Sequence, residues 1–191
     1  MTDAVVLVDD DGRVVGEAPR LAVHDHDTPL HLAFSLHLFD PEGRVLLTRR
    51  ALAKRTWPGV WTNSCCGHPR PDEDGPGAIV RRLGEELGVQ VEDLRCVLPD
   101  FRYRAVDASG VVENELCPVW VGRVRGAVLA DPDEVAEWTW LPWDDLVTAI
   151  TAAPPAFSPW AALAVPAMVD TGFTPGSWPA AAPSRPEEAR G

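Results

Sequence analysis

The sequence predicts an α+β fold, in which a mixed β-sheet has helices packed against it. Short alternating segments separated by polar turns fill most of the first half of the chain, and an amphipathic helical segment follows at residues 76–87. From Pro175 onward the content of Pro, Ala and Ser rises and periodicity is lost, which is typical of a flexible tail. We therefore expect one domain over residues 1–174 and a tail over residues 175–191.

The expected strands pair through short turns in both halves of the chain. In order, they are Ala4–Val8 and Arg13–Glu17 around a turn at residues 9–12, Leu30–Phe39 and Arg44–Arg50 around residues 40–43, Asp100–Val106 and Val111–Arg125 around residues 107–110, and Glu137–Leu141. An N-capped helix is predicted over Asp144–Ala153, and a last helix over residues 159–170.

The helical segment at residues 76–87 has the most complete set of local signals. Its apolar residues recur at helical spacing, namely Ile79, Val80, Leu83 and Leu87. Pro76 suits a first helical turn, and Gly88 stands where a helix end favours a residue that tolerates positive φ. Arg82 and Glu86 are four residues apart, so we expect them to share one face of the helix.

Composition limits the classes of function. A length of 191 residues with 46% hydrophobic residues is enough for one packed domain. The net charge of −12 argues against nucleic acid or an anionic membrane as the main partner. The acidic N-terminal segment lacks the basic region of a signal peptide, and no apolar run reaches membrane-spanning length. The four cysteines show no zinc or redox spacing, so free thiols and a cytoplasmic location are expected.

A spaced motif begins at Gly67. It has the form G-x5-E-x7-R through Glu73 and Arg81, and continues with Arg82, Leu83, Gly84, Glu85, Glu86, Gly88 and Val89. This resembles the Nudix box, which presents carboxylates to Mg²⁺ and a pyrophosphate. Arg82 replaces the first glutamate of the R-E-x-x-E-E core. Since the change removes a carboxylate and adds paired N–H donors, it favours binding a diphosphate over cutting it.

A second group of residues has the chemistry of metal ligands: His24, His31, His68, Glu113 and Glu115. Glu113 and Glu115 are two apart in a predicted strand and so face the same side, where a cation or a shared proton would relieve their repulsion. The nitrogen and oxygen donors suit Mn²⁺, Fe²⁺ or Zn²⁺ better than Mg²⁺ alone. The alternative is that His24 and His31 are only hydrogen-bonded, which we expect of His26 and His37.

Segments along most of the chain resemble type I isopentenyl-diphosphate isomerases. They are LHLAFSLHLF, RRALAKRTWPGVWTN, TNSCCGHP, DFRYRA, ENELCPV and AFSPW, in the expected order between about residues 5 and 165. The resemblance implies a Nudix-type mixed sheet sandwiched by helices, with an N-terminal β-hairpin extension and a Pro/Ala-rich C-terminal tail. It also implies an enzyme of isoprenoid precursor biosynthesis that converts isopentenyl diphosphate into dimethylallyl diphosphate by protonation at C4 and deprotonation at C2.

The same resemblance implies roles for individual residues. Cys66 and Glu115 match the catalytic pair, and Tyr103 and Trp160 match aromatics beside the reacting carbons. His24, His31, His68, Glu113 and Glu115 match the ligands of a protein-bound divalent metal, expected to be Mn²⁺, Zn²⁺ or Mg²⁺. Glu86 matches the ligand of the Mg²⁺ that accompanies the diphosphate. Arg20, Arg50, Lys54 and Arg82 match the diphosphate-binding residues, although the family often has lysine where Arg20 stands. A monomer or weak homodimer is expected.

The chemistry explains these residue types. Isomerising an unactivated alkene requires one group to protonate C4 and another to remove a proton from C2, through a tertiary cation. Cys66 and Glu115 are the candidates on opposite faces of a dry pocket, with a thiol titrating near enough to neutrality to exchange its proton. The indole face of Trp160 can stabilise the cation. Which of the pair donates first stays open.

Several residues have an ordinary alternative. Cys65, Cys96 and Cys117 are expected in the core, and the other tryptophans in packing. Strand alternation separates Arg49 from Arg50, and motif register chooses Arg50. Two other functions compete with isomerisation. One is a Nudix hydrolase of nucleoside diphosphate derivatives, and the other is an inactive module that only binds a diphosphate. Arg82 argues against the first, and the intact Cys66 and Glu115 pair argues against the second.

Overall fold

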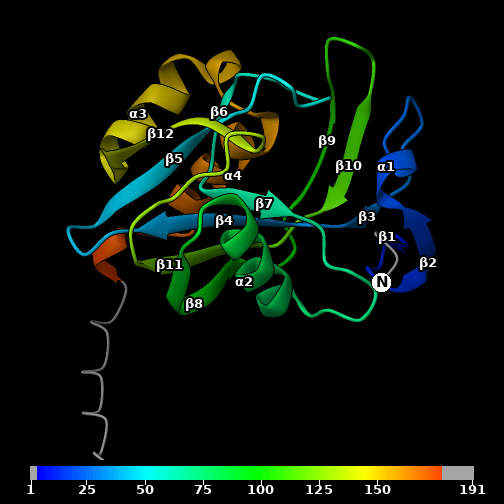
Figure 1. Cartoon of the computed structure of the whole chain (residues 1–191), viewed down its shortest axis with the longest axis horizontal. Helices are drawn as coiled ribbons and strands as arrows, with labels where there is room; N and C mark the ends of the chain where they lie inside the picture. The colour runs from blue at the N-terminus through cyan, green and yellow to red at the C-terminus, as the bar shows by residue number, and fades with distance from the viewer. Residues whose placement is uncertain (1–3, 178–191) are drawn as a thin grey trace, which may run out of the picture.

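The strands divide between two mixed sheets in the computed structural model, which describes residues 4–177 (Figure 1). The five-stranded sheet has the order β2-β1-β3-β10-β9, with bounds β1 Ala4–Val8, β2 Val14–Pro19, β3 His31–Leu32, β9 Arg102–Val106 and β10 Val112–Leu116. The seven-stranded sheet has the order β12-β5-β4-β11-β8, with β6 added on β5 and β7 on β4. Its bounds are β4 Phe34–Phe39, β5 Arg44–Arg50, β6 Trp61–Thr62, β7 Cys65–Gly67, β8 Gln90–Leu98, β11 Val119–Arg125 and β12 Val135–Pro142.

Two neighbouring stretches of the chain pass together from the five-stranded sheet into the seven-stranded sheet. β3 pairs with β10, and β4 pairs with β11. Between them, the N–H of Ala33 donates to the carbonyl of Leu116 at 2.9 Å, and that of Ser35 donates to Pro118 at 3.1 Å. Pro118 has no N–H of its own, so the ladder cannot continue through it. The long strands predicted at residues 30–39 and 111–125 are therefore each broken, and the break joins the two sheets.

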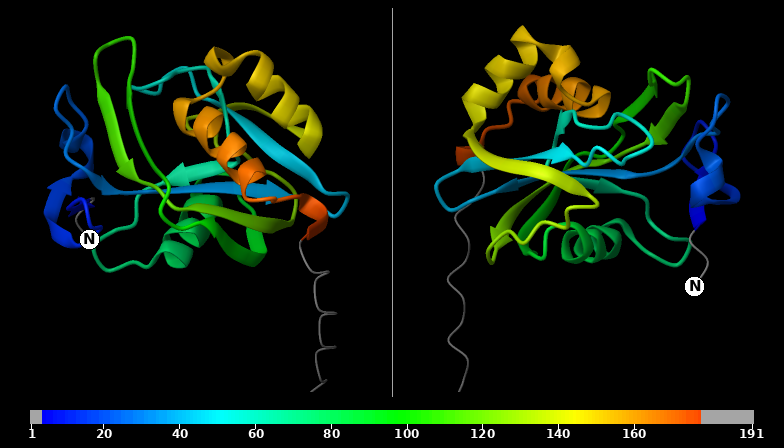
Figure 2. Two further views of the ribbon diagram at one scale, coloured as in Figure 1. Left: turned by 180° about the vertical axis from the view of Figure 1, so that it is seen from behind. Right: turned by 45° about the horizontal axis from the view of Figure 1, so that its top comes forward.

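Helices cover both faces of the seven-stranded sheet (Figure 2). On one face lies α2 (Gly75–Glu86), whose Ile79 and Leu83 pack against buried residues of β4. On the other lie α3 (Trp143–Ala152) and α4 (Pro159–Asp170), which pack against β5 and β11. The remaining helical segments are α1 (Arg20–Val23), η1 (Pro154–Ala156) and η2 (Pro175–Ser177). This layering confirms the predicted α+β sandwich.

Helix α2 begins and ends within one residue of the predicted bounds. The side chain of Asp74 caps it by accepting a hydrogen bond from the N–H of Gly77 at 2.7 Å. Gly88 follows the helix at φ +63°, as expected of a residue that ends a helix. Val80 is 56% exposed and does not belong to the apolar face, contrary to the prediction.

Several local predictions differ from the structure. Strand β8 was not expected, because charged and half-exposed residues interrupt its alternation. The hairpin between β4 and β5 pairs only at Phe39 and Val45. Helix α3 follows Pro142, and no side chain among the described residues caps it. Cys96 is exposed rather than in the core. Most of the predicted tail, with Trp178, lies outside the described residues, and no helix within residues 4–177 is long and apolar enough to cross a membrane.

Candidate active site

A cavity of about 510 Å³ lies where the two sheets meet. It gathers nearly all of the predicted site residues from segments far apart in the sequence: Arg20, His24, Arg50, Lys54, Cys66, His68, Arg82, Glu86, Tyr103, Glu113, Glu115 and Trp160. His31 is fully buried directly behind the cavity wall, in contact with His68 and Glu115. The sequence therefore predicted which side chains meet, although it did not predict the shape that they enclose.

One end of the cavity holds the predicted metal ligands. One ligand atom from each of His24, His31, His68, Glu113 and Glu115 lies within 4.8 Å of the others. Nε2 of His68 is 3.0 Å from Oε1 of Glu115 and 3.2 Å from Nε2 of His31. Nε2 of His24 lies 3.0 Å from Oε2 of Glu113. Five nitrogen and oxygen donors thus converge on one point.

The fold brings these donors together through strand register. Glu113 and Glu115 share one face of β10 because they are two residues apart. In the neighbouring strands, His31 on β3 and Tyr103 on β9 stand directly opposite Glu115. His24 ends the short helix α1, and His68 directly follows β7. β10 therefore supplies the two carboxylates, and three different segments around it supply the three imidazoles.

The donor set fits a divalent cation. Within the described part of the chain, Nε2 of His24 and Oε2 of Glu113 are buried without a hydrogen-bond partner, although they lie close together. Two such lone pairs that face each other are costly to bury unless a cation lies between them. Nδ1 of His31 is 2.9 Å from the carbonyl of Pro29, and Nε2 points into the cluster, 3.2 Å from Nε2 of His68. The five residues therefore suit a metal site.

Burial and mutual contacts shift the acid–base behaviour of this cluster. Burial would raise the pKa of Glu115, but the hydrogen bonds from His31 and His68 hold it well below its usual range. Burial likewise opposes protonation of His31, but its hydrogen bond to Glu115 leaves its pKa raised. For His68 burial dominates, and its pKa is lowered. The cluster therefore favours an ionised Glu115.

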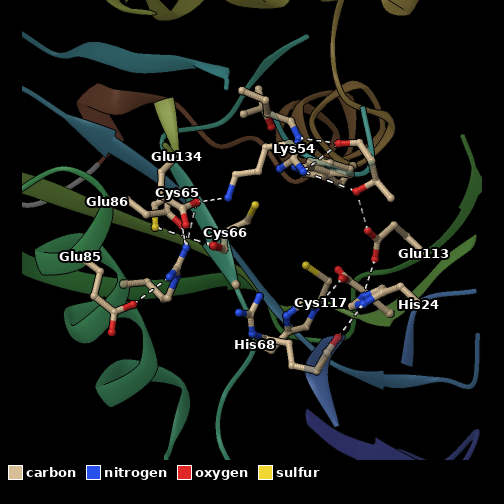
Figure 3. Close-up of a pocket in the computed structure, with 18 of the residues that line it drawn as sticks. His24, Lys54, Cys65, Cys66, His68, Glu85, Glu86, Glu113, Cys117 and Glu134 are labelled. Atoms are coloured by element: carbon tan, nitrogen blue, oxygen red, sulfur yellow. Dashed lines mark hydrogen bonds and ion pairs between the residues drawn. The ribbon is translucent and has the colours of Figure 1, made fainter. Parts of the chain in front are cut away.

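Cys66 lies between the two ends of the cavity (Figure 3). Because successive side chains of β7 point to opposite faces, Cys65 packs in the core beneath α2, whereas Cys66 faces Tyr103 and Trp160. The two adjacent thiols therefore face different parts of the site, although Cys65 also borders the cavity, beside Glu86. Burial raises the pKa of Cys66 to about 12. The expectation of a thiol that titrates near neutrality is therefore wrong for this pocket, which favours the protonated form.

Aromatic rings form the wall beside Cys66. The ring of Trp160, on α4, lies 5.8 Å from that of Tyr103 and 5.6 Å from that of Trp57, measured between centroids. The guanidinium of Arg50 stands 5.3 Å over the ring of Trp160. Trp57 was expected to serve packing, and the sequence gives no sign that its packing partner is Trp160. Its backbone has φ +43°, a conformation that a bulky residue rarely adopts.

The opposite end of the cavity carries basic and acidic side chains together. Arg82 forms an ion pair with Glu86, with which it was predicted to share a helix face, and a second pair at 2.8 Å with Glu85, which was not predicted. Lys54 forms an ion pair with Glu134, which also lies 3.3 Å from Arg82. Glu134 lines the cavity, yet no motif spacing singles it out. Burial raises the pKa of Glu86 despite its contact with Arg82.

The first glutamate and first arginine of the box, Glu73 and Arg81, have a scaffolding position. Arg81 donates to the Glu73 carboxylate through Nε at 2.6 Å and Nη2 at 2.8 Å. Glu73 in turn accepts from the N–H of Arg70 at 3.0 Å, and Arg81 donates to the carbonyl of His68 at 3.2 Å. The pair therefore ties α2 to the loop that carries His68.

Comparison with known proteins gives consistent results. The family model described as NUDIX domain matches residues 29–163. An isopentenyl-diphosphate Delta-isomerase from Mycolicibacterium vanbaalenii is 60% identical over 90% of this chain and 94% of its own length. One from Frankia alni is 62% identical over 83% of this chain and 81% of its own.

Solved structures show the same fold at low identity. A protein from Deinococcus radiodurans matches 86% of this chain and 98% of its own length, with a TM-score of 0.68 and 20% identity. A MutT protein from Methanosarcina mazei matches 76% of this chain and 97% of its own length, with a TM-score of 0.59 and 17% identity. At such identities the likeness concerns the fold alone.

Proposed function

The chain belongs to the NUDIX domain family and, within it, to the isopentenyl-diphosphate Delta-isomerases, and we propose that the cavity between its two sheets is the active site. The enzyme interconverts isopentenyl diphosphate and dimethylallyl diphosphate. The single observation that supports the location is that Cys66 and Glu115 reach one cavity from β7 and β10, beside an aromatic wall.

Cys66 and Glu115 form the proton-transfer pair. One group gives its proton to C4, whose double bond to C3 supplies the electrons, and C3 becomes a tertiary cation. The other group takes a proton from C2, and the C2–H electrons form the new C2–C3 double bond. The protons balance, and no electron acceptor is needed. The first donor is the group that carries a proton when the substrate binds, because a thiol and a carboxylic acid each carry one transferable proton.

The aromatic wall stabilises the cation that forms between the two transfers. Trp160 is almost fully buried, and Tyr103 lies beside it. The face of an indole ring attracts a cation by roughly 2 kcal/mol or more when water is excluded. Tyr103 stays protonated, since burial and the Glu115 carboxylate raise its pKa well above the usual value. Because both rings are buried, the wall also keeps water away from the cation.

The basic end of the cavity binds the diphosphate. Lys54 and Arg82 lie at this end, and Arg50 and Arg20 of α1 line the same cavity. Guanidinium groups bind phosphate oxygens through paired N–H donors. Glu86 holds the Mg²⁺ that arrives with the diphosphate, since hard cations prefer carboxylate oxygens. Arg82 is already oriented by Glu85 and Glu86 on the same helix face. This end is therefore organised before the substrate binds.

The His24, His31, His68, Glu113 and Glu115 cluster holds a divalent metal, for which Mn²⁺ or Zn²⁺ suits the mixture of imidazole and carboxylate better than Mg²⁺. When bound, the metal supplies positive charge that keeps Glu115 ionised and in place. Glu113 stays in position through Oε1, which accepts a hydrogen bond from the hydroxyl of Thr56 at 3.2 Å.

The proposed roles are tested by product analysis. Isopentenyl diphosphate is incubated with the metal-loaded enzyme, Cys66→Ala and Glu115→Gln, and proton NMR follows loss of the exocyclic methylene signals as the two product methyl groups appear. We expect conversion by the wild type, and a loss of at least about 1,000-fold in both variants, because each removes one of two obligatory proton carriers. Conversion by Cys66→Ala at the wild-type rate would exclude Cys66 from the pair.

Hydrolysis is the competing reaction of the fold. In this chain Arg82 stands where the box would place another carboxylate, so fewer oxygen ligands remain for the metal ions that hydrolysis requires. We expect no phosphate or nucleoside monophosphate to be released from nucleoside diphosphate derivatives. If phosphate or nucleoside monophosphate were released at rates comparable with isomerisation, the chain would be a hydrolase as well as an isomerase.

A further inference from the structure

Asn63 connects the two walls of the proposed reaction pocket without lining it. It is fully buried, in the turn between β6 and β7, and it does not border the cavity. We propose that Asn63 is a positioning residue that fixes the indole of Trp160 relative to the strand that carries Cys66. The inference rests on the proposed function, since it assigns the spacing of two groups in that reaction.

The carboxamide of Asn63 uses its whole hydrogen-bonding capacity. Its Oδ1 accepts from Nε1–H of Trp160 at 2.9 Å and from the hydroxyl of Thr62 at 2.8 Å. Its Nδ2 donates to the carbonyl of Cys65 at 2.6 Å and to that of Leu36 at 3.2 Å. A reversed amide would set its N–H groups against the indole N–H and its oxygen against two carbonyls. Only one orientation is therefore compatible with these partners.

The two sides of this contact lie next to the reacting groups. The carbonyl of Cys65 belongs to the same peptide group as the N–H of Cys66, so the bond from Asn63 holds the backbone at the proposed proton carrier. On the other side, the indole N–H is the only hydrogen-bond donor of the Trp160 side chain. Its bond to Asn63 therefore sets the orientation of the ring about its own axis.

The start of α4 is fixed by the same segment. The hydroxyls of Thr62 and Ser158 lie 2.7 Å apart, and the N–H of Ser158 donates to the carbonyl of Trp61 at 2.8 Å. Ser158 also caps α4 by accepting from the N–H of Ala161 at 3.3 Å. Because the helix start is already held by these bonds, the carboxamide of Asn63 adds a constraint on the ring itself.

The diphosphate end has its own contacts. Lys54 bonds to Glu134, and Arg82 to the acidic residues of α2 and to Glu134. Asn63 is therefore expected to affect the chemical step more than the binding of substrate. A residue that served stability alone would leave turnover by the folded enzyme unchanged.

Ser64 provides a matched control. It is equally buried and adjacent in sequence, and its hydroxyl donates to the carbonyl of Leu46 and accepts from the N–H of Leu38, both at 2.7 Å. It has no bond to Trp160 or to the peptide of Cys66 among the described residues. Ser64→Ala thus removes a buried polar side chain from the same turn, but it keeps the hydrogen bonds of Asn63 to Trp160 and to the carbonyl of Cys65.

The test measures kcat and KM of the metal-loaded enzyme carrying Asn63→Ala or Ser64→Ala, at a temperature where circular dichroism shows each variant folded. We expect Asn63→Ala to lower kcat by about 10- to 100-fold, as small misplacements of reacting groups do, and to change KM by less than about 3-fold. Ser64→Ala should keep kcat within about 2-fold of the wild type. Equal kcat values in the two folded variants would overturn the positioning role.

A second measurement requires no folded Asn63 variant. In wild-type protein labelled with ¹⁵N, the indole N–H of Trp160 is assigned by its loss in Trp160→Phe, and its exchange with D₂O is compared with that of Trp138, which is 42% exposed. We expect exchange at least about 100-fold slower for Trp160, because its N–H is bonded and buried. Equal exchange rates for Trp160 and Trp138 would show that Asn63 does not hold the indole N–H of Trp160, and would overturn the proposal. A protected indole in a wild type that does not isomerise would instead overturn the proposed function.

Discussion

Replacing Glu73 by glutamine is expected to destabilise the fold at neutral pH and to lose that effect in acid. In the wild type, the carboxylate accepts two hydrogen bonds from Arg81 and one from the N–H of Arg70. The hydrogen bonds from Arg81 lower the pKa of Glu73 from 4.5 to about 2. The variant keeps the side-chain shape but removes the charge that Arg81 binds.

The magnitude follows from the shifted pKa. A fall from 4.5 to about 2 corresponds by linkage to at most about 3 kcal/mol. The Glu73 side chain is 21% exposed, and solvent screening reduces this limit, so we expect about 1–2 kcal/mol. Because the folded pKa is depressed, the contribution is complete above pH 4.5 and is lost as the pH falls toward 2. The difference between wild type and variant should follow the same course.

Urea unfolding of both proteins at pH 7, 5, 4 and 3.5 measures this difference. Glu85→Gln serves as the control, since Glu85 is more exposed and pairs with Arg81 at 3.3 Å, so we expect a loss of about 0–1 kcal/mol. A difference between wild type and Glu73→Gln that stays constant from pH 7 to pH 3.5 would refute the electrostatic account. Equal stability at pH 7 would refute the scaffolding role of the pair.

The aromatic wall, the metal cluster, Glu134 and the core beneath α2 each lead to a further expected result. Trp160→Phe should lower kcat by about 30-fold, the equivalent of about 2 kcal/mol of cation–π stabilisation, and steady-state kinetics in which only KM rises would contradict the role of the indole. Removing the metal with a chelator should lower the melting temperature, and Mn²⁺ at about 100 times its Kd should restore about 2.7 kcal/mol; a melting curve indifferent to Mn²⁺ would argue against the metal centre. Glu134→Gln should strengthen binding of inorganic pyrophosphate without Mg²⁺ several-fold, because Lys54 and Arg82 lose a competing carboxylate, and titration calorimetry showing weaker binding would contradict this. Leu83→Ala, in the core beneath α2, should cost about 3–5 kcal/mol in urea unfolding, and a loss below about 1 kcal/mol would mean that the helix packs loosely.

The parts of the site with a local signal could be predicted from the sequence. Helical spacing placed Arg82 beside Glu86, and strand alternation placed Glu113 and Glu115 on one face. Alternation also separated Arg50, which lines the cavity, from its neighbour Arg49, which pairs with Glu137. These relations depend only on the geometry of a single helix or strand. These side-chain relations therefore do not depend on how the helix or strand packs in the fold.

Contacts between distant segments could not be predicted in this way. Glu134 meets Lys54 across 80 residues, and Asn63 meets Trp160 across 97, with no repeat or spacing to indicate either pair. Trp57 differs from the other tryptophans only by where its loop packs. The break of β10 from β11 at Pro118 accompanies the passage of two neighbouring strands from one sheet into the other, and only the second of these features needs the whole fold. Tertiary packing decides all of these. The expected monomer or weak homodimer and the domain bounds stay predictions.

The position of deuterium in the product tests the central claim most directly. Isopentenyl diphosphate is incubated in D₂O with the metal-loaded enzyme and Mg²⁺, and NMR locates the label in dimethylallyl diphosphate. We expect deuterium in the methyl group derived from C4, and no labelled product with Cys66→Ala. Unchanged substrate in the presence of folded, metal-loaded protein would contradict the isomerase assignment, and product without deuterium would contradict proton transfer by exchangeable side chains.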